Sequence, residues 1–139
     1  MGYVVAQFML LVFIAWPLAS FKLSIVGLLV MLLSLLIALS ALMANCPGNF
    51  NVRPQPKLTG VLIVHGPYKF IRHPMYSSLI FGCLGMLLCQ FSYIKLGAWL
   101  LLIIVLALKA RFEEKALCLH YPQYQSYKKS NKAIIPWIW

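Results

Sequence analysis

The sequence predicts an all-α integral membrane protein of about four transmembrane helices, with a cytoplasmic C-terminal extension that forms a binding site. Of the 139 residues, 63% are hydrophobic and only 10% are charged, which is too apolar for a soluble domain of this size. The apolar residues fall into four runs, and a helix needs about 20 such residues to cross roughly 30 Å of hydrocarbon. The connections between the runs also differ sharply in their content of basic residues.

The four apolar runs define a single membrane domain, 1–139, with no room for a second, soluble one. The first two runs are joined by so short a connection that we expect a tight antiparallel hairpin, and the fourth run is short for a full crossing. The runs are Tyr3–Ser20, Leu23–Met43, Met75–Tyr93 and Leu96–Leu108. The domain divides into an N-terminal helical hairpin, a cytoplasmic loop, and a second helical hairpin with a C-terminal tail, at 1–44, 45–73 and 74–139.

Basic residues cluster in the 45–73 loop and in the C-terminal tail, whereas the other two connections hold only Lys22 and Lys95. Positively charged loops stay in the cytoplasm. We therefore expect both termini and the 45–73 loop to be cytoplasmic, and the brief loops favour a prokaryotic inner membrane. The net charge of +10 is explained by this topology and by contact with anionic lipid head groups, so no nucleic acid partner is expected.

The third helix is predicted to begin at Arg72-His73-Pro74, because proline suits the first helical position. Its leading backbone N–H groups, beside a cation and a histidine, favour binding of a carboxylate or phosphate. The alternative is that Arg72 is an ordinary cytoplasmic anchor and His73 a helix cap. A stripe of small side chains follows along one face and allows close approach of another backbone; it comprises Ser78, Gly82, Gly85 and Cys89.

The only two carboxylates of the chain, Glu113 and Glu114, are adjacent. No helix breaker occurs before Pro122, so the fourth helix is expected to run from about Gly97 to about His120 and to carry both glutamates into the cytoplasm. A short interfacial helix with an aromatic face should follow. Carboxylates near hydrocarbon cost a few kcal/mol unless they are paired or solvated. We expect them to bind a ligand ammonium or ribose diol, or an internal arginine; the alternative is a solvated face on which they pair with Lys109 and Arg111.

The cysteines show no spacing typical of a metal site, so no metal is expected. We interpret them as small apolar packing residues; they are Cys46, Cys83, Cys89 and Cys118.

The two polar clusters together resemble the signature of the isoprenylcysteine carboxyl methyltransferase family, much of which small phospholipid methyltransferases share. The first half is Gly66-Pro67-Tyr68-x-x-x-Arg72-His73-Pro74-Met75-Tyr76. The second half is Glu113-Glu114, Leu117, Tyr124, Tyr127 and Ile135-Pro136. The chain departs from the family pattern at Ser78, where glycine is frequent, and at His120-Tyr121, where Phe-Gly is common.

The resemblance implies S-adenosylmethionine binding in the C-terminal half and a catalytic role for the 74–139 hairpin. Arg72 and His73 suit the cofactor carboxylate, and Glu113 or Glu114 suits its ammonium or ribose diol. Tyr68 and Tyr76 are expected to cover the adenine or border the sulfonium, with Ser78 and the small-residue stripe lying against the cofactor. Arg111 either orients an acceptor carboxylate or holds Glu114, and it is our candidate catalytic residue together with Tyr76.

The acceptor implied by the resemblance is a lipophilic or prenylated molecule in the bilayer, foremost the carboxylate of an isoprenylcysteine. Three alternatives stay open at this point. The first is N-methylation of a phospholipid amine. The second is an NADPH-dependent enzyme similar to sterol reductases, whose Arg-x-Pro-Asn-Tyr segment resembles the one here. The third is a non-catalytic membrane protein. The sequence does not determine the oligomeric state.

Overall fold

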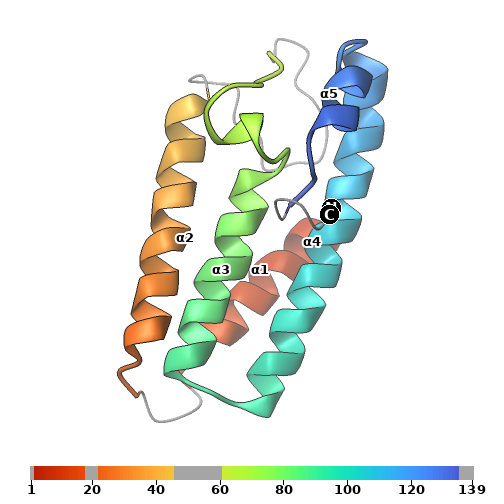
Figure 1. Cartoon of the computed structure of the whole chain (residues 1–139). Helices are drawn as coiled ribbons and strands as arrows, with labels where there is room; N and C mark the ends of the chain where they lie inside the picture. The colour runs from red at the N-terminus through yellow and green to blue at the C-terminus, as the bar shows by residue number, and fades with distance from the viewer. Residues whose placement is uncertain (1, 18–21, 46–60, 135–139) are drawn as a thin grey trace.

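The computed structural model describes residues 2–17, 22–45 and 61–134, and these residues contain no β-strand. They form five α-helices and one short 3₁₀-helix, arranged as an elongated bundle (Figure 1). The elements are α1 (Gly2–Ala15), α2 (Ile25–Ala44), η1 (Gly66–Lys69), α3 (Pro74–Cys89), α4 (Tyr93–His120) and α5 (Tyr124–Ser130). The all-α prediction is confirmed, and so are the start of the third helix at Pro74 and the end of the fourth at His120.

Two of the helices, α2 with 20 residues and α4 with 28, are long and apolar enough to cross a membrane. The helices α1 and α3, with 14 and 16 residues, are apolar but shorter. At 1.5 Å per residue, α3 covers roughly 24 Å, somewhat less than the hydrocarbon core. Many large apolar side chains on α1 and α2 are exposed, as expected for helices that face lipid. The four-span topology is therefore retained as a prediction.

The small-residue stripe of α3 packs against α2. A Cβ atom added at Gly85 would lie 2.4 Å from Met31 Cγ and 2.8 Å from the Gly27 carbonyl oxygen, so the two backbones nearly touch. The Ser34 hydroxyl crosses the same interface and donates a hydrogen bond of 2.7 Å to the Ser78 carbonyl. The expected close approach of a second backbone is confirmed. The expectation that a cofactor lies along this face stays a prediction, although α2 already packs against it at Gly82 and Gly85.

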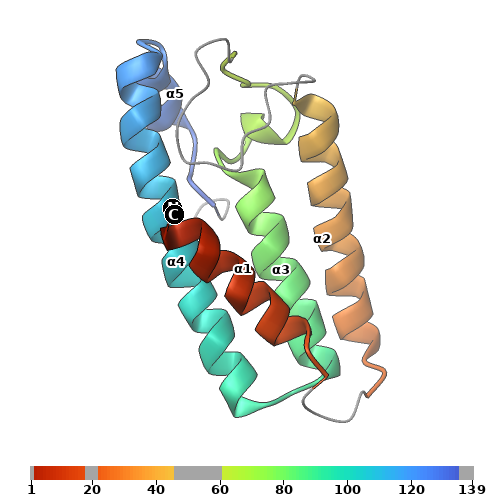
Figure 2. The same ribbon diagram turned by 180° about the vertical axis from the view of Figure 1, so that it is seen from behind.

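The helix α1 packs mainly on α4 and also contacts α3, whereas the main partner of α2 is α3. Figure 2 shows α1 crossing diagonally in front of the bundle, from α4 to the lower end of α3. The predicted tight hairpin of the first two helices is therefore wrong as a packing unit. The physical reason is that α3 offers α2 a groove of glycines, which α1 does not.

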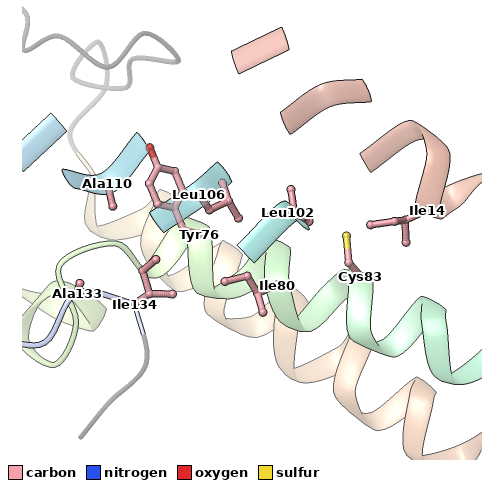
Figure 3. Packing of buried hydrophobic residues seen from close by; sticks show 9 residues of the cluster. All are labelled: Ile14, Tyr76, Ile80, Cys83, Leu102, Leu106, Ala110, Ala133 and Ile134. Atoms are coloured by element: carbon pink, nitrogen blue, oxygen red, sulfur yellow. The ribbon is translucent and has the colours of Figure 1, made fainter. Parts of the chain in front are cut away.

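The core lies between α3, α4 and the segment after α5 (Figure 3). Tyr76 and Ile80 of α3 face Leu102 and Leu106 of α4, and Ile134 from beyond α5 closes the cluster. Leu102 and Leu106 are fully buried. The end of the described chain is thus part of the same core as the start of α3.

Two backbone features hold the start of α3 in place. Gly66, at a φ of 61°, opens η1 in the left-handed region that favours glycine. Further on, the N–H of Arg72 donates to Lys132 O at 2.8 Å and that of His73 donates to Ala133 O at 2.9 Å. The Ser77 hydroxyl also donates to the Ile134 carbonyl. The start of α3 and the segment after α5 are therefore tied side by side.

Candidate functional site

The two polar clusters that the sequence singles out meet in the structure. Arg72, just before α3, donates from Nε to Glu114 Oε1 at 2.8 Å, across 42 residues of sequence. His73 Nε2 lies 3.3 Å from the same oxygen. The continuation of α4 past its apolar run makes this possible, because it carries Glu114 six residues beyond Leu108, which is under two helical turns, and alongside the start of α3. Arg72 and Glu114 therefore lie together, as a single binding site requires, and the site itself stays a prediction.

Glu114 is enclosed by cationic groups, since Lys128 of α5 adds an ion pair of 2.9 Å to its second oxygen. Its side chain is only 5% exposed. Buried carboxylates survive only when paired and hydrogen-bonded in this way. The sequence analysis did not identify Lys128 as a partner of Glu114. The available signal was that Lys128 follows Tyr124 by four residues and so lies one turn further along the same short helix.

Arg72 also fastens the C-terminal segment. One terminal nitrogen donates to the carbonyl of Lys128 at 2.8 Å and also to that of Asn131. Tyr127 and Asn131 in turn donate from their side chains to the Tyr68 carbonyl, the latter at 3.0 Å. The guanidinium of Arg72 is therefore largely engaged by the protein itself, as the link between α4, α5 and the start of α3.

Glu113 has a different environment from its neighbour. The Tyr76 hydroxyl donates to Glu113 Oε1 at 2.6 Å, and His73 Nδ1 lies 3.7 Å from Oε2. The rings of His73 and Tyr76 are stacked, with centroids 5.2 Å apart and an interplanar angle of 5°. The Glu113 side chain is 18% exposed, against 5% for Glu114. Glu113 is thus the more accessible carboxylate and has a neutral hydroxyl donor as its closest partner.

A buried cation on the apolar side of this cluster was missed as a site residue. Lys109 is 3% exposed, donates to Gln7 Oε1 at 2.9 Å, and places its ammonium 5.1 Å from the centroid of the Tyr76 ring. Arg111, by contrast, is exposed. Helical spacing could have indicated this, because Lys109 is four residues before Glu113 and shares its face, whereas Arg111, two residues before it, does not.

The tyrosines around the cluster are held in their neutral form. Burial, and then the charge of Glu113, raise the pKa of Tyr68. Burial, and then the charge of Glu114, raise the pKa of Tyr124. Burial also raises the pKa of Tyr127. All three therefore keep their protons at physiological pH and are able to donate a hydrogen bond.

The hydroxyl of Tyr124 is distinctive among these. The residue is only 1% exposed, and within the described residues its hydroxyl is the one buried side-chain oxygen or nitrogen without a hydrogen-bond partner. Buried polar groups without partners are rare in native structures and call for an explanation such as an absent ligand or water. The Tyr124 ring lies against that of Tyr127, with centroids 5.7 Å apart, so Tyr124 packs beside a residue that is bonded to Tyr68.

Two sequence-based expectations differ from the geometry. Ser78 lies on the α2 side of α3, where its hydroxyl donates to the Met75 carbonyl of its own helix at 2.8 Å, so it is not brought to the cluster. The first-turn N–H groups of Tyr76 and Ser77 both bond to the His73 carbonyl, at 3.0 and 3.2 Å. These two groups are therefore not available as an anion cradle.

The model of the isoprenylcysteine carboxyl methyltransferase (ICMT) family matches residues 25–119, more than half of the chain, including the first polar cluster and Glu113-Glu114 of the second. The chain belongs to this family. A search of the curated proteins found no match. Family membership and the two long apolar helices assign the chain to the membrane methyltransferases, whose ICMT members use S-adenosylmethionine in general. The helices α1 and α5 lie outside the matched residues.

Proposed function

We propose that this ICMT-family protein transfers a methyl group from S-adenosylmethionine to the carboxylate of an isoprenylcysteine-type lipid at the cytoplasmic face of the membrane. The observation that carries the proposal is the arrangement of three groups around Tyr76. Glu113 is bonded to its hydroxyl, His73 is stacked on its ring, and the Lys109 ammonium lies over that ring. An accessible carboxylate for the cofactor and a buried cation for an acid acceptor are thus separated by one aromatic side chain.

The residues of the cluster fit the cofactor chemically. S-Adenosylmethionine carries an ammonium and a ribose diol, which a partly exposed carboxylate such as Glu113 binds well. Tyr68 and the orphaned hydroxyl of Tyr124 supply neutral donors for its polar edges. When bound, the cofactor supplies an electrophilic methyl group on a sulfonium that leaves as a neutral thioether.

Arg72 and Glu114 receive a supporting role in this proposal. Their contacts with each other, with Lys128 and with the tail use much of their hydrogen-bonding capacity. We therefore assign them to holding α4, α5 and the start of α3 in register, and we assign Glu113, His73, Tyr68, Tyr76 and Tyr124 to the cofactor. This revises the cofactor-carboxylate role expected for Arg72.

Lys109 replaces Arg111 as the proposed acceptor-binding residue. Its ammonium is buried beside Tyr76 on the apolar side of the cluster, where the head of a lipid acceptor would enter, whereas Arg111 is exposed. An ionised carboxylate attacks a methyl group without needing a base, so this chain's contribution is to orient it and exclude water. A lipid ammonium would instead have to lose a proton beside a cation. This difference favours O-methylation over the N-methylation alternative.

The distribution of basic residues supports the proposed topology. Lys69 of η1 and Lys128 of α5 belong to elements at one end of the bundle (Figure 1). Lys22 precedes α2 and Lys95 lies in the first turn of α4, and both helices begin at the opposite end. By the positive-inside rule, the site end faces the cytoplasm. We propose four membrane helices with both termini cytoplasmic, in a prokaryotic inner membrane, and one membrane domain over 1–139.

Two measurements on the full chain in lipid nanodiscs test the proposal. Calorimetry should detect binding of S-adenosylhomocysteine and no binding of NADPH. Incubation with methyl-labelled S-adenosylmethionine should then label an N-acetyl-S-prenylcysteine as a base-labile ester and leave phosphatidylethanolamine unlabelled. Labelling of the amine lipid alone would establish N-methylation instead. Binding of NADPH alone would establish the reductase alternative, and binding of neither nucleotide would favour a non-catalytic protein.

A further inference from the structure

The helix α1 contributes one buried amide to an otherwise apolar surface. Gln7 is 6% exposed, and its Oε1 accepts the hydrogen bond from Lys109 Nζ at 2.9 Å. The pair joins residues 102 positions apart, from two helices that pack along each other. Because Gln7 lies outside the residues matched by the family model, it belongs to no part of the recognised signature.

A packing role alone does not explain this residue. An amide and an ammonium buried among apolar helices each cost a few kcal/mol, and a leucine would serve the α1–α4 contact without that cost. The amide accepts only one of the three hydrogen bonds that an ammonium can donate. It therefore fixes the position of Lys109 and leaves further donors for another acceptor.

The neutrality of Gln7 is equally informative. A glutamate at this place would hold the ammonium as firmly but would cancel its charge, whereas the glutamine preserves it. The nearest carboxylate, Glu113, is engaged by the Tyr76 hydroxyl at 2.6 Å and lies beside His73. The Tyr76 ring stands against the ammonium at 5.1 Å, an interaction that also leaves the positive charge uncancelled.

We propose that Gln7 is a positioning residue that holds the Lys109 ammonium, with its charge intact, toward the acceptor, and so selects acidic over amine-bearing acceptors. This inference rests on the proposed methyltransferase function and assigns its acceptor selectivity to α1. In the reaction it governs, an acceptor carboxylate oxygen forms a bond to the methyl carbon and the carbon–sulfur bond breaks. The sulfur keeps the electron pair, and the positive charge of the sulfonium and the negative charge of the carboxylate disappear together. No proton is released.

The decisive variant is Gln7→Glu, because it keeps the hydrogen bond to Lys109 and changes only the charge. A structural hydrogen bond would be preserved or strengthened by this change, so the thermal unfolding temperature should not fall. The KM for an N-acetyl-S-prenylcysteine should rise about tenfold or more, the expected effect of losing one charge-assisted hydrogen bond. The affinity for S-adenosylhomocysteine should stay within twofold of wild type, as roughly expected for an untouched site.

Two further variants separate positioning from packing. Gln7→Leu should also raise the acceptor KM, but with a lower unfolding temperature, because it leaves the ammonium without its partner. Ile14→Val changes a buried α1 residue of the bundle core, 1% exposed, whose side chain carries no polar atom. It should leave the acceptor KM unchanged while costing some stability.

An acceptor KM of Gln7→Glu within twofold of wild type would overturn the inference, as would equal effects of Gln7→Glu and Ile14→Val on acceptor and cofactor. Failure of the proposed function is distinguishable, because it would appear in the wild-type protein. A wild type that binds no S-adenosylhomocysteine, or that methylates no acid acceptor, would overturn both proposals before any variant is compared.

Discussion

Replacing Tyr124 with phenylalanine removes a single buried oxygen atom, and we expect it to move stability and ligand affinity in opposite directions. In the ligand-free protein this hydroxyl is buried without a hydrogen-bond partner among the described residues. Such a group costs about 1–3 kcal/mol, so its removal should raise the free energy of unfolding by about 1 kcal/mol. For a chain of this length that corresponds to an increase of roughly 3–5 °C in unfolding temperature.

In the complex the same hydroxyl is expected to bond to the cofactor, so the variant should bind more weakly. The loss of one neutral hydrogen bond, about 0.5–1.5 kcal/mol, corresponds to roughly a two- to twelvefold increase in Kd. Calorimetry with S-adenosylhomocysteine measures this change, and thermal unfolding with and without the ligand measures the stability change. Tyr93→Phe is the matched control, because Tyr93 is 82% exposed at the opposite end of α4. A Tyr124→Phe protein that is less stable than wild type and binds the ligand equally well would refute the reasoning.

Three further predictions concern other parts of the molecule. Gly85→Ala should lower the free energy of unfolding by about 1–3 kcal/mol, because its Cβ would lie 2.4 Å from Met31 Cγ and 2.8 Å from a backbone oxygen. Gly97→Ala, where the added Cβ meets nothing within 4 Å, should be neutral or stabilising by up to about 1 kcal/mol in the same denaturation assay. Equal costs of the two changes would disprove the close contact at Gly85. Glu114→Gln should destabilise by about 3 kcal/mol or more, because it leaves the largely enclosed Arg72 without its counter-charge, whereas Glu113→Gln should mainly weaken S-adenosylhomocysteine binding. The reverse pattern would contradict the division of roles between the two glutamates. In steady-state kinetics, Lys109→Met should raise the KM for the acid acceptor about tenfold or more, whereas Arg111→Ala should change it by less than about twofold. A larger effect of Arg111→Ala would restore Arg111 as the acceptor-binding residue.

Much of the local structure could be predicted from the sequence because strong signals mark it. Pro74 fixes the start of α3, and the lack of a breaker before Pro122 carries α4 to His120. The meeting of Arg72 with Glu114 was predictable because charges near hydrocarbon need partners and each side offered few. The spacing of the two half-signatures along the chain then indicated one site.

The partners of the apolar helices could not be predicted in the same way. An apolar helix offers no polar face to orient it in lipid, so the sequence of α1 does not reveal that it packs on α4 and not on α2. The stripe around Gly85 indicated a close approach but not whether α2 or a ligand would make it. The spacing of Lys109 from Glu113 was an available signal, but its contact with Gln7, 102 residues away, arises only from the helix packing.

The pairing between the start of α3 and the segment after α5 has a consequence for biogenesis. The backbone of Arg72 and His73 is held by Lys132 and Ala133, and Ser77 is held by Ile134. During translation, the backbone N–H groups of residues 72 and 73 therefore lack these partners until about sixty more residues have been synthesised. We infer that a nascent chain arrested within α5 inserts its apolar helices yet has no assembled site, and that the protein becomes competent only when this late segment is released to dock.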